Sequence, residues 1–270
     1  MPSPPPAPSA APPAGLPTAS QNVSVLPVVP HARRCLHCDP PLTPAGFFAR
    51  RQPALVGLGA VFLLMAVAAL VSGGAVLLTW DEPIQRAVEA SRTSLFDGIF
   101  SRVSFLGSTV FVLTFGCVLA AVAWRRCRTV GVAVILAMLS RPLLEFTLKA
   151  IVGRDRPDLE RMVDGTGPSF PSGHVMAAVA VWGLLPLVVS LYTSNRRVWW
   201  STTVGSAALI VAIGASRIYL GVHWFSDVIG GLIVGAFFLL GTEWVLTRQH
   251  RRDPCVRGCA CVHTEEPARL

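Results

Sequence analysis

The sequence is poor in charged residues, and in lysine above all. Only 14% of its 270 residues are charged and 52% are hydrophobic, whereas a soluble domain averages about 25% charged residues. This scarcity excludes an ordinary soluble domain and predicts a polytopic membrane protein whose core is a helix bundle in lipid. Lys149 is the only lysine among 23 basic residues. The preference for arginine suggests a high-GC genome, so the one lysine that remains is the more informative.

The net charge of +8 does not indicate a nucleic-acid partner. The arginines cluster in short loops and tails, where they determine membrane topology. The sequence shows neither an RNA-binding motif nor a basic face interleaved with aromatic residues. Membrane lipids are therefore the expected surroundings, and no nucleic acid is expected.

The N-terminal segment does not have the pattern of a secretory signal. Residues 1–30 contain ten prolines, and no basic stretch precedes an apolar one, so a cleaved signal peptide is not expected. The composition predicts a disordered tail. We expect a Pro-rich cytoplasmic tail over 1–50, a membrane domain over 51–248, and a cytoplasmic tail containing cysteine and arginine over 249–270.

Six apolar runs are long enough to span a bilayer, because each is close to the roughly 20 residues that a spanning helix needs. Buried strands would be shorter, so the predicted fold class is all-α. The expected spans are 53–79, 103–124, 129–152, 173–193, 199–219 and 225–247.

The loops between these runs predict the orientation. Arginines precede the first span, join the second to the third and the fourth to the fifth, and follow the sixth. The positive-inside rule assigns these segments, and with them both termini, to the cytoplasm. The mixed-charge segment 80–102, which could form an interfacial helix, the loop 153–172 and the turn 220–224 then lie outside.

Three polar strings stand at the outer ends of these runs. The first contains Lys149 and Arg156, seven residues apart. On a continuous helix ended by Pro157 both would project from one face, although Gly153 offers an earlier bend. Taken singly, each cation could simply reach the interface from a helix end.

The second string, Pro171-Ser172-Gly173-His174, begins the fourth span. Serine is a favoured N-cap and glycine permits close backbone approach. The free N–H groups of a helix N-terminus bind anions. The alternative interpretation is an ordinary capped helix start with an interfacial histidine.

The third string carries Ser216-Arg217, then His223 and Asp227. Histidine and aspartate at i and i+4 share one helix face, and a carboxylate can hold one imidazole nitrogen while the other acts as nucleophile or base. A His/Asp pair alone is more often structural. Three cations, a helix N-terminus, a nucleophile and a separate acid together predict a site for a phosphate ester.

The order Lys-x6-Arg-Pro, Pro-Ser-Gly-His, Ser-Arg-x5-His-x3-Asp resembles the type 2 phosphatidic acid phosphatase family, which shares its core with vanadium haloperoxidases. The resemblance covers residues 53–247, includes Leu106-Gly107-Ser108 in the second span, and omits both tails. It implies a six-transmembrane-helix bundle with a haloperoxidase-like phosphatase core.

The resemblance also implies roles for the motif residues. His223 would attack phosphorus and form a phosphohistidine, Asp227 would orient His223, and His174 would protonate the leaving oxygen. The phosphoryl oxygens would be held by Lys149, Arg156, Ser172, Gly173 and Arg217. The family needs no catalytic metal and no other cofactor.

Two further features lie outside the motifs. Arg141, Glu145 and Lys149 follow one another at i+4 steps in the third span, where charges are costly unless paired. They could form a buried ion network that holds the bundle, or Glu145 could fix the Lys149 ammonium from behind.

Five cysteines lie in the tails, near His37 and His263. Their spacing could form a shared zinc site, and unliganded flexible tails are the alternative. The five are Cys35, Cys38, Cys255, Cys259 and Cys261.

The sequence therefore predicts an integral membrane phosphatase that hydrolyses a lipid phosphate or diphosphate on the extracytoplasmic face. The expected substrates are a polyprenyl diphosphate, phosphatidic acid or phosphatidylglycerophosphate. A lipid phosphotransferase and a non-catalytic lipid-phosphate binding or transport protein are the alternatives. A soluble haloperoxidase is disfavoured by the six apolar runs.

Overall fold

A computed structural model describes residues 46–71, 74–158, 161–193 and 195–249 of the chain. These residues form helices joined by turns and one long loop, and the described part contains no strand. The all-α prediction is confirmed. The helices are α1 (Gly46–Val71), α2 (Ala75–Ala90), α3 (Ser94–Phe105), α4 (Thr109–Arg126), α5 (Arg128–Val152), α6 (Gly173–Trp182), α7 (Leu185–Ser190), α8 (Arg196–Tyr219) and α9 (Phe225–Gln249).

Five stretches of the described residues are long and apolar enough to cross a membrane: α4, α5, α6 with α7, α8 and α9. A sixth span is present if the bent pair α1 and α2 counts as one. The six-span bundle is confirmed in this sense. The fourth span is not one helix, because α6 ends at Trp182 and α7 begins at Leu185.

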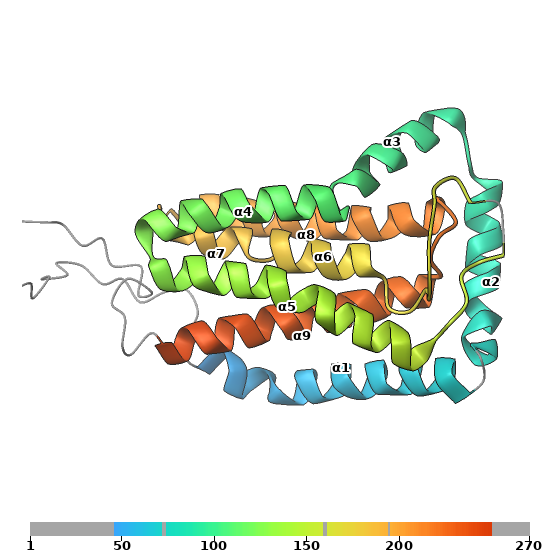
Figure 1. Cartoon of the computed structure of the whole chain (residues 1–270), viewed down its shortest axis with the longest axis horizontal. Helices are drawn as coiled ribbons and strands as arrows, with labels where there is room; N and C mark the ends of the chain where they lie inside the picture. Colours follow the sequence, from blue (N-terminus) through green and yellow to red (C-terminus); the bar gives the residue numbers. More distant parts are fainter. Residues whose placement is uncertain (1–45, 72–73, 159–160, 194, 250–270) are drawn as a thin grey trace, which may run out of the picture. The chain divides into compact units, whose positions relative to one another are not determined.

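The first predicted span is too long. We expected one helix over 53–79, but α1 ends at Val71 and α2 departs from it at 101°. Gly74 precedes α2 with φ +92°, a conformation that costs glycine little and other residues more. The chain therefore turns at the end of the bundle, and α2 runs across that end instead of extending the span (Figure 1).

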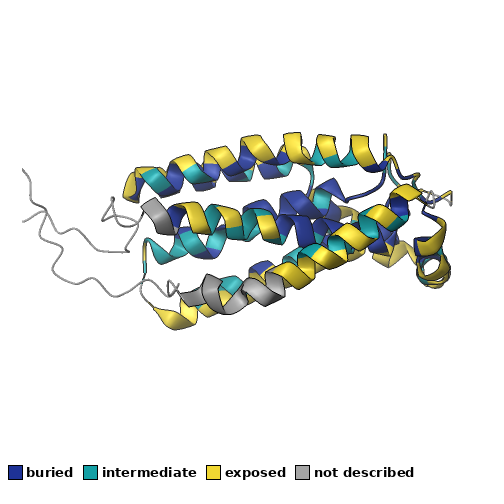
Figure 2. Cartoon of the chain, turned by 90° about the horizontal axis from the view of Figure 1, so that it is seen from below, coloured by how far each residue is buried: buried dark blue, intermediate teal, exposed yellow. Residues whose placement is uncertain are grey.

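The outer faces of the long helices are apolar, as a bilayer requires. Figure 2 shows exposed residues along the outside of the bundle and buried ones along its inside. The exposed residues include Leu63, Val110, Leu139, Phe146 and Val204, each more than 60% exposed. In lipid these side chains need no protein partner, because the acyl chains are as apolar as leucine.

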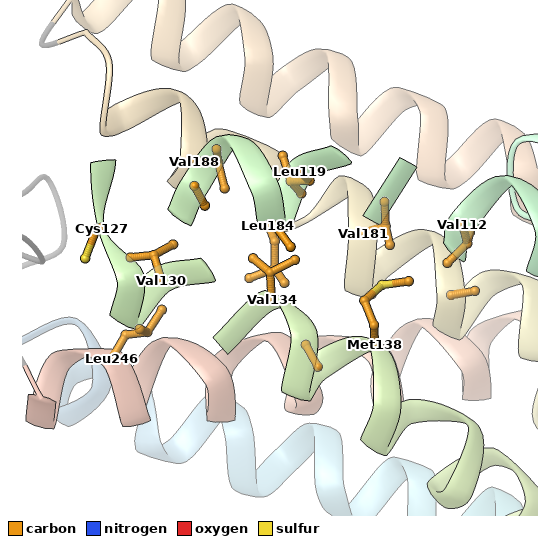
Figure 3. Packing of buried hydrophobic residues seen from close by; sticks show 14 residues of the cluster. Val112, Leu119, Cys127, Val130, Val134, Met138, Val181, Leu184, Val188 and Leu246 are labelled. Atoms are coloured by element: carbon orange, nitrogen blue, oxygen red, sulfur yellow. The ribbon is translucent and has the colours of Figure 1, made fainter. Parts of the chain in front are cut away.

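A core of small and branched side chains holds α4, α5, α6, α7 and α9 together. Val134 and Val181 are fully buried near its centre (Figure 3). Gly116 on α4 lies against Met138 on α5, where a Cβ atom would collide with the thioether. This close packing fixes α5 relative to its neighbours, and α5 carries Lys149 at its end.

The three polar strings lie together at one end of the bundle. The C-termini of α5 and α8 and the N-termini of α6 and α9 meet there, beside α2 and α3 (Figure 1). α2 is attached through Gln85, whose Nε2 donates to the carbonyl of Ile218 at 3.0 Å. α3 is attached through Asp97, which accepts from the Tyr219 hydroxyl at 2.7 Å. The segment 80–102 is therefore two helices that support the ends of α8 and α9.

Candidate active site

His223 lies in the turn just before α9 and is 2% exposed. Its Nδ1 is 3.4 Å from Oδ2 of Asp227 in the first turn of α9. The same carboxylate oxygen accepts from the Trp224 backbone N–H at 2.9 Å. The predicted His/Asp pair is thus formed, and Nε2 of His223 is the ring nitrogen that does not face Asp227.

Arg156 lies beside that second nitrogen, with Nη1 at 3.4 Å from His223 Nε2. It comes from the loop 153–172, because α5 ends at Val152 and Gly153 takes the left-handed conformation with φ +62°. The earlier bend is therefore realised, and Lys149 and Arg156 do not share one helix. Backbone carbonyls of Val222, Thr166 and Gly167 accept from the guanidinium at 2.7, 2.9 and 2.9 Å.

The N-terminus of α6 provides the second wall of the site. Ser172 is the N-cap, fully buried, yet its hydroxyl has no hydrogen-bond partner among the described residues. The first N–H groups of a helix likewise lack an intrahelical acceptor. His174 follows in the first turn of α6 and is partly exposed. Gly107 packs against the His174 backbone carbonyl, where a Cβ atom would lie at 3.3 Å.

Arg217 closes the site from the end of α8 and is 5% exposed. Its Nη1 donates to the hydroxyl of Ser104 on α3 at 2.6 Å. Its buried Nε atom has no partner in the described part of the chain. Buried donors are nearly always satisfied, so the Nε of Arg217 and the hydroxyl of Ser172 are two donors that an acceptor could satisfy.

Lys149 and Glu145 complete the site from α5. The Lys149 ammonium is 3.0 Å from Oε1 of Glu145, and Arg141 Nη1 is 2.5 Å from Oε2. The carboxylate also lies against Gly173, where any side chain would clash with it. Both interpretations of the α5 ladder are consistent with this geometry: the three charges are paired, and Glu145 holds Lys149 next to the α6 N-terminus.

The electrostatics of the site keep His223 neutral. Burial lowers the pKa of His223 to about 4, opposed by Asp227 and assisted by the positive charges of Arg156 and Arg217. Burial also lowers the pKa of Arg156. A neutral imidazole whose Nδ1 faces a carboxylate has a free lone pair on Nε2, which is the form required of a nucleophile.

Two aromatic residues beside His223 differ in their surroundings. Aromatic residues such as Trp224 and Phe225 are common at a membrane interface. Phe225 is 39% exposed, but Trp224 is only 8% exposed, lies 5.6 Å from the Arg154 guanidinium and donates to the Asp155 carbonyl at 3.1 Å. Trp224 therefore packs within the protein, and only Phe225 is available to lipid.

Sequence reasoning missed several buried partners of the site. Arg154 bridges Asp81 and Asp227 with distances of 2.7 Å to each carboxylate, and Ser226 joins them. Arg154 and Ser226 stand within or next to the motifs, so their position was a signal. Asp81 gave none, because it lies far away in the sequence among ordinary surface charges.

The tail cysteines proposed as a zinc site, Cys35, Cys38, Cys255, Cys259 and Cys261, lie outside the described residues. Within those residues, no group of three or more histidine, cysteine, aspartate and glutamate side chains could hold a metal ion.

Comparison with known proteins identifies the family. Residues 130–251 match the PAP2 superfamily. Phosphatidylglycerophosphatase B of Bacillus subtilis is 31% identical over 191 residues, which cover 68% of this chain and 92% of that protein. Glucose-6-phosphatase 3 of Bos taurus is 30% identical over 174 residues, covering 57% of this chain and 48% of that enzyme.

A solved structure agrees with the sequence matches. The crystal structure of the transmembrane PAP2-type phosphatidylglycerolphosphate phosphatase from Bacillus subtilis is similar with a TM-score of 0.64 and 26% identity, over 72% of this chain and 96% of that chain. Fold and matches together define a multi-pass membrane phosphatase. The chain belongs to the PAP2 superfamily, as its motif order predicted, and its membrane relatives support lipid phosphate hydrolysis.

Proposed function

We propose that this protein hydrolyses a lipid phosphate monoester or diphosphate on the extracytoplasmic face of the membrane, through a phosphohistidine at His223. The observation that carries the proposal is the set of polar groups at the end of the bundle that carries His223. His223 Nε2 stands next to Arg156, while the buried Ser172 hydroxyl and the Arg217 Nε have no protein partner. A phosphoryl group supplies acceptors for both and an electrophile for the imidazole.

The first step is an in-line attack on phosphorus. The lone pair of His223 Nε2 forms the N–P bond, and the bond from phosphorus to the lipid oxygen breaks. His174 donates its proton to the leaving oxygen, so a monoester releases the lipid as an alcohol and a diphosphate releases it as a lipid monophosphate. Asp227, next to Nδ1, stabilises the positive charge that develops on the ring, and the cations neutralise the equatorial oxygens.

The second step releases phosphate. Water attacks the phosphohistidine, and the now neutral His174 accepts its proton. The N–P bond breaks, its electron pair returns to His223 Nε2, and inorganic phosphate leaves. Both histidines are then in their starting forms. A phosphotransferase would differ only in using another alcohol instead of water.

The proposed substrate class is a lipid with a terminal phosphate, and phosphatidylglycerophosphate is the first candidate. The similar Bacillus enzyme, of which this chain covers 92%, is named for that lipid. The apolar outer faces of the helices and the exposed Phe225 allow a lipid to approach laterally. The glucose-6-phosphatase relative makes a water-soluble sugar phosphate the comparison substrate, although this chain spans only about half of that enzyme.

The test is phosphate release by purified protein in detergent across a panel of phosphate compounds. The panel contains phosphatidylglycerophosphate, phosphatidic acid, a polyprenyl diphosphate and glucose 6-phosphate, each with wild type and with His223→Ala. We expect turnover of at least one lipid that exceeds turnover of the sugar phosphate, is abolished in His223→Ala, and persists in EDTA. Turnover confined to the sugar phosphate would refute the lipid assignment. Binding of every lipid without turnover would favour the non-catalytic alternative, and restoration by Mg²⁺ after EDTA would refute the metal-free mechanism.

A further inference from the structure

A buried ion cluster lies directly behind the His223–Asp227 pair. It consists of Asp81 on α2, Arg154 in the loop after α5, and Ser226 and Asp227 at the start of α9. All four residues are at most 4% exposed. None of the four is among the residues proposed to hold the phosphoryl group, and Asp227 is the member that the cluster shares with the His223–Asp227 pair. The cluster therefore connects that pair to helix α2.

The contacts within this cluster run in a chain. Arg154 Nη1 donates to Asp227 Oδ1 at 2.7 Å and to the Ser226 hydroxyl at 2.6 Å, while Nη2 donates to Asp81 Oδ2 at 2.7 Å. The Ser226 hydroxyl and backbone N–H donate to Asp81 at 2.5 and 2.9 Å. The Asp81 carboxylate therefore binds both the Arg154 guanidinium and the first turn of α9.

Arg154 is closely packed on two sides. Its guanidinium lies 5.6 Å from the Trp224 ring, and a Cβ atom on Gly74 would come within 3.0 Å of its Nε. Asp81 shares its helix face with Leu77 and Gln85, which are also buried. α2 thus presents one carboxylate to the active site and holds it there with two packed neighbours.

The division of the Asp227 oxygens is the functional consequence. Arg154 takes Oδ1, so Oδ2 is left to the Trp224 N–H and to His223 Nδ1. The cluster contains two carboxylates and one guanidinium, and so has one net negative charge next to the imidazole. That excess charge favours the positive ring that forms when Nε2 bonds to phosphorus.

We propose that Asp81 and Arg154 are positioning residues of the phosphatase reaction, which orient Asp227 and set the net charge that faces His223. This inference rests on the proposed function. It makes helix α2, remote in sequence from every motif, a functional part of the active site. If Asp81 and Arg154 only stabilised the fold, replacing them would not change the pH at which His223 becomes protonated during turnover.

Variants that change the net charge of the cluster distinguish a positioning role of Asp81 and Arg154 from a purely structural one. Arg154→Gln leaves two uncompensated carboxylates, which favour protonated His223, so the acid limb of the kcat/KM profile should move to higher pH by about one unit. Asp81→Asn removes the negative excess, so the limb should move to lower pH. The double variant restores one net negative charge, and its limb should return close to that of wild type. The other groups that face His223, namely Arg156, Arg217 and His174, are unchanged in all three.

The experiment measures kcat, KM and the pH profile of the three variants in detergent, with Asp97→Asn as the matched control. Asp97 is a carboxylate on the neighbouring helix α3 that accepts from Tyr219 and does not contact Arg154 or Asp227 in the described structure. We expect the single variants to lose roughly 100-fold in kcat, the scale for a small misplacement of reacting groups, with KM little changed. Asp97→Asn should keep the wild-type profile.

Several outcomes decide the inference. Opposite displacement of the acid limb in the two single variants and its recovery in the double variant support it. Unmoved limbs overturn it, as does a loss explained by lower folded protein, measured by size-exclusion chromatography and thermal melting. If Arg154→Gln fails to fold, Asp81→Asn and the double variant still decide. Absence of phosphate release by wild type would instead refute the proposed function, and the two failures are therefore distinguishable.

Discussion

At the scale of the residue, His174 should matter most when the leaving group is poor. It lies in the first turn of α6, within electrostatic reach of Arg217, His223 and Lys149. We expect His174→Ala to lower turnover of a lipid phosphate by at least about 100-fold, because general acid catalysis contributes roughly 10²–10⁴-fold. An activated aryl phosphate should lose much less, since its phenolate leaves without a proton. The measurement compares kcat for both substrates in both proteins, and equal losses would contradict the acid role.

His223 makes a second prediction, for the pH dependence of the wild type. Because its pKa is lowered to about 4, the imidazole stays neutral at all higher pH values, and the acid limb of the kcat/KM profile should lie near pH 4. Loss of the proton from His174, the proposed general acid, governs the alkaline limb instead. An ordinary histidine would place this limb near pH 6.5. The unfolded chain binds this proton first, so the same shift removes stability as the pH falls from about 6.5 towards 4. A rate profile recorded with a detergent-solubilised lipid tests the first statement, and an acid limb near 6.5 would contradict it.

The residues of the three strings lie at one end of the bundle, and the roles assigned to them remain predictions. They could be singled out from the sequence because a lone lysine, a capped helix start and a His/Asp pair each have a physical meaning at their own position. Asp81 was not readable, because its role depends on α2 folding back against the end of α9. Ser104, which supports Arg217 from α3, was missed for the same reason.

At the scale of the element, the α6 N-terminus depends on the absence of a side chain at Gly173. A methyl group there would collide with the Glu145 carboxylate. If Glu145 moves to avoid the collision, its partner Lys149 is displaced as well. We expect Gly173→Ala to lower stability by about 1–3 kcal/mol and to lower activity at least tenfold. Gly205→Ala in α8 is the matched control, because nothing lies within 4 Å of its added atom and alanine favours a helix by about 1 kcal/mol.

The two glycine variants are compared by thermal melting in detergent and by phosphate release. A Gly173→Ala protein as active and stable as Gly205→Ala would contradict the prediction, because it would show that the close contact between Glu145 and the α6 N-terminus is not needed.

The long elements were predictable from hydropathy, whereas the first interruption was missed. Ser72-Gly73-Gly74 after Val71 is a turn signal, but the apolar residues that resume at Ala75 kept the average hydropathy high and hid it. The turn depends on Gly74 and on polar contacts that α2 makes with Ile218 and Arg154. By contrast, the bend at Gly153 was one of the two expectations for the end of α5, and its left-handed conformation places Arg156 on a loop beside His223.

At the scale of the whole molecule, the arginines that begin two helices and the candidate site lie at opposite ends of those helices. Arg128 begins α5 and Lys149 stands near its end; Arg196 begins α8 and Arg217 stands near its end. The positive-inside rule then predicts that the site faces away from the cytoplasm. We expect a single cysteine at Thr166 to react with a membrane-impermeant thiol reagent on intact cells, and one at Asn195 to be protected until the cells are opened. Both are placed in a background without native cysteines, and the reverse labelling pattern would assign the site to the cytoplasm.

The central claim is that His223 is phosphorylated during turnover. It is tested most directly by mixing the protein with a lipid phosphate, quenching in alkali to preserve acid-labile phosphohistidine, and mapping the phosphate by mass spectrometry. We predict phosphate on the peptide that contains His223, acid-labile, appearing only with substrate and absent from His223→Gln. Phosphate on another residue, or full turnover by His223→Gln, would contradict the mechanism.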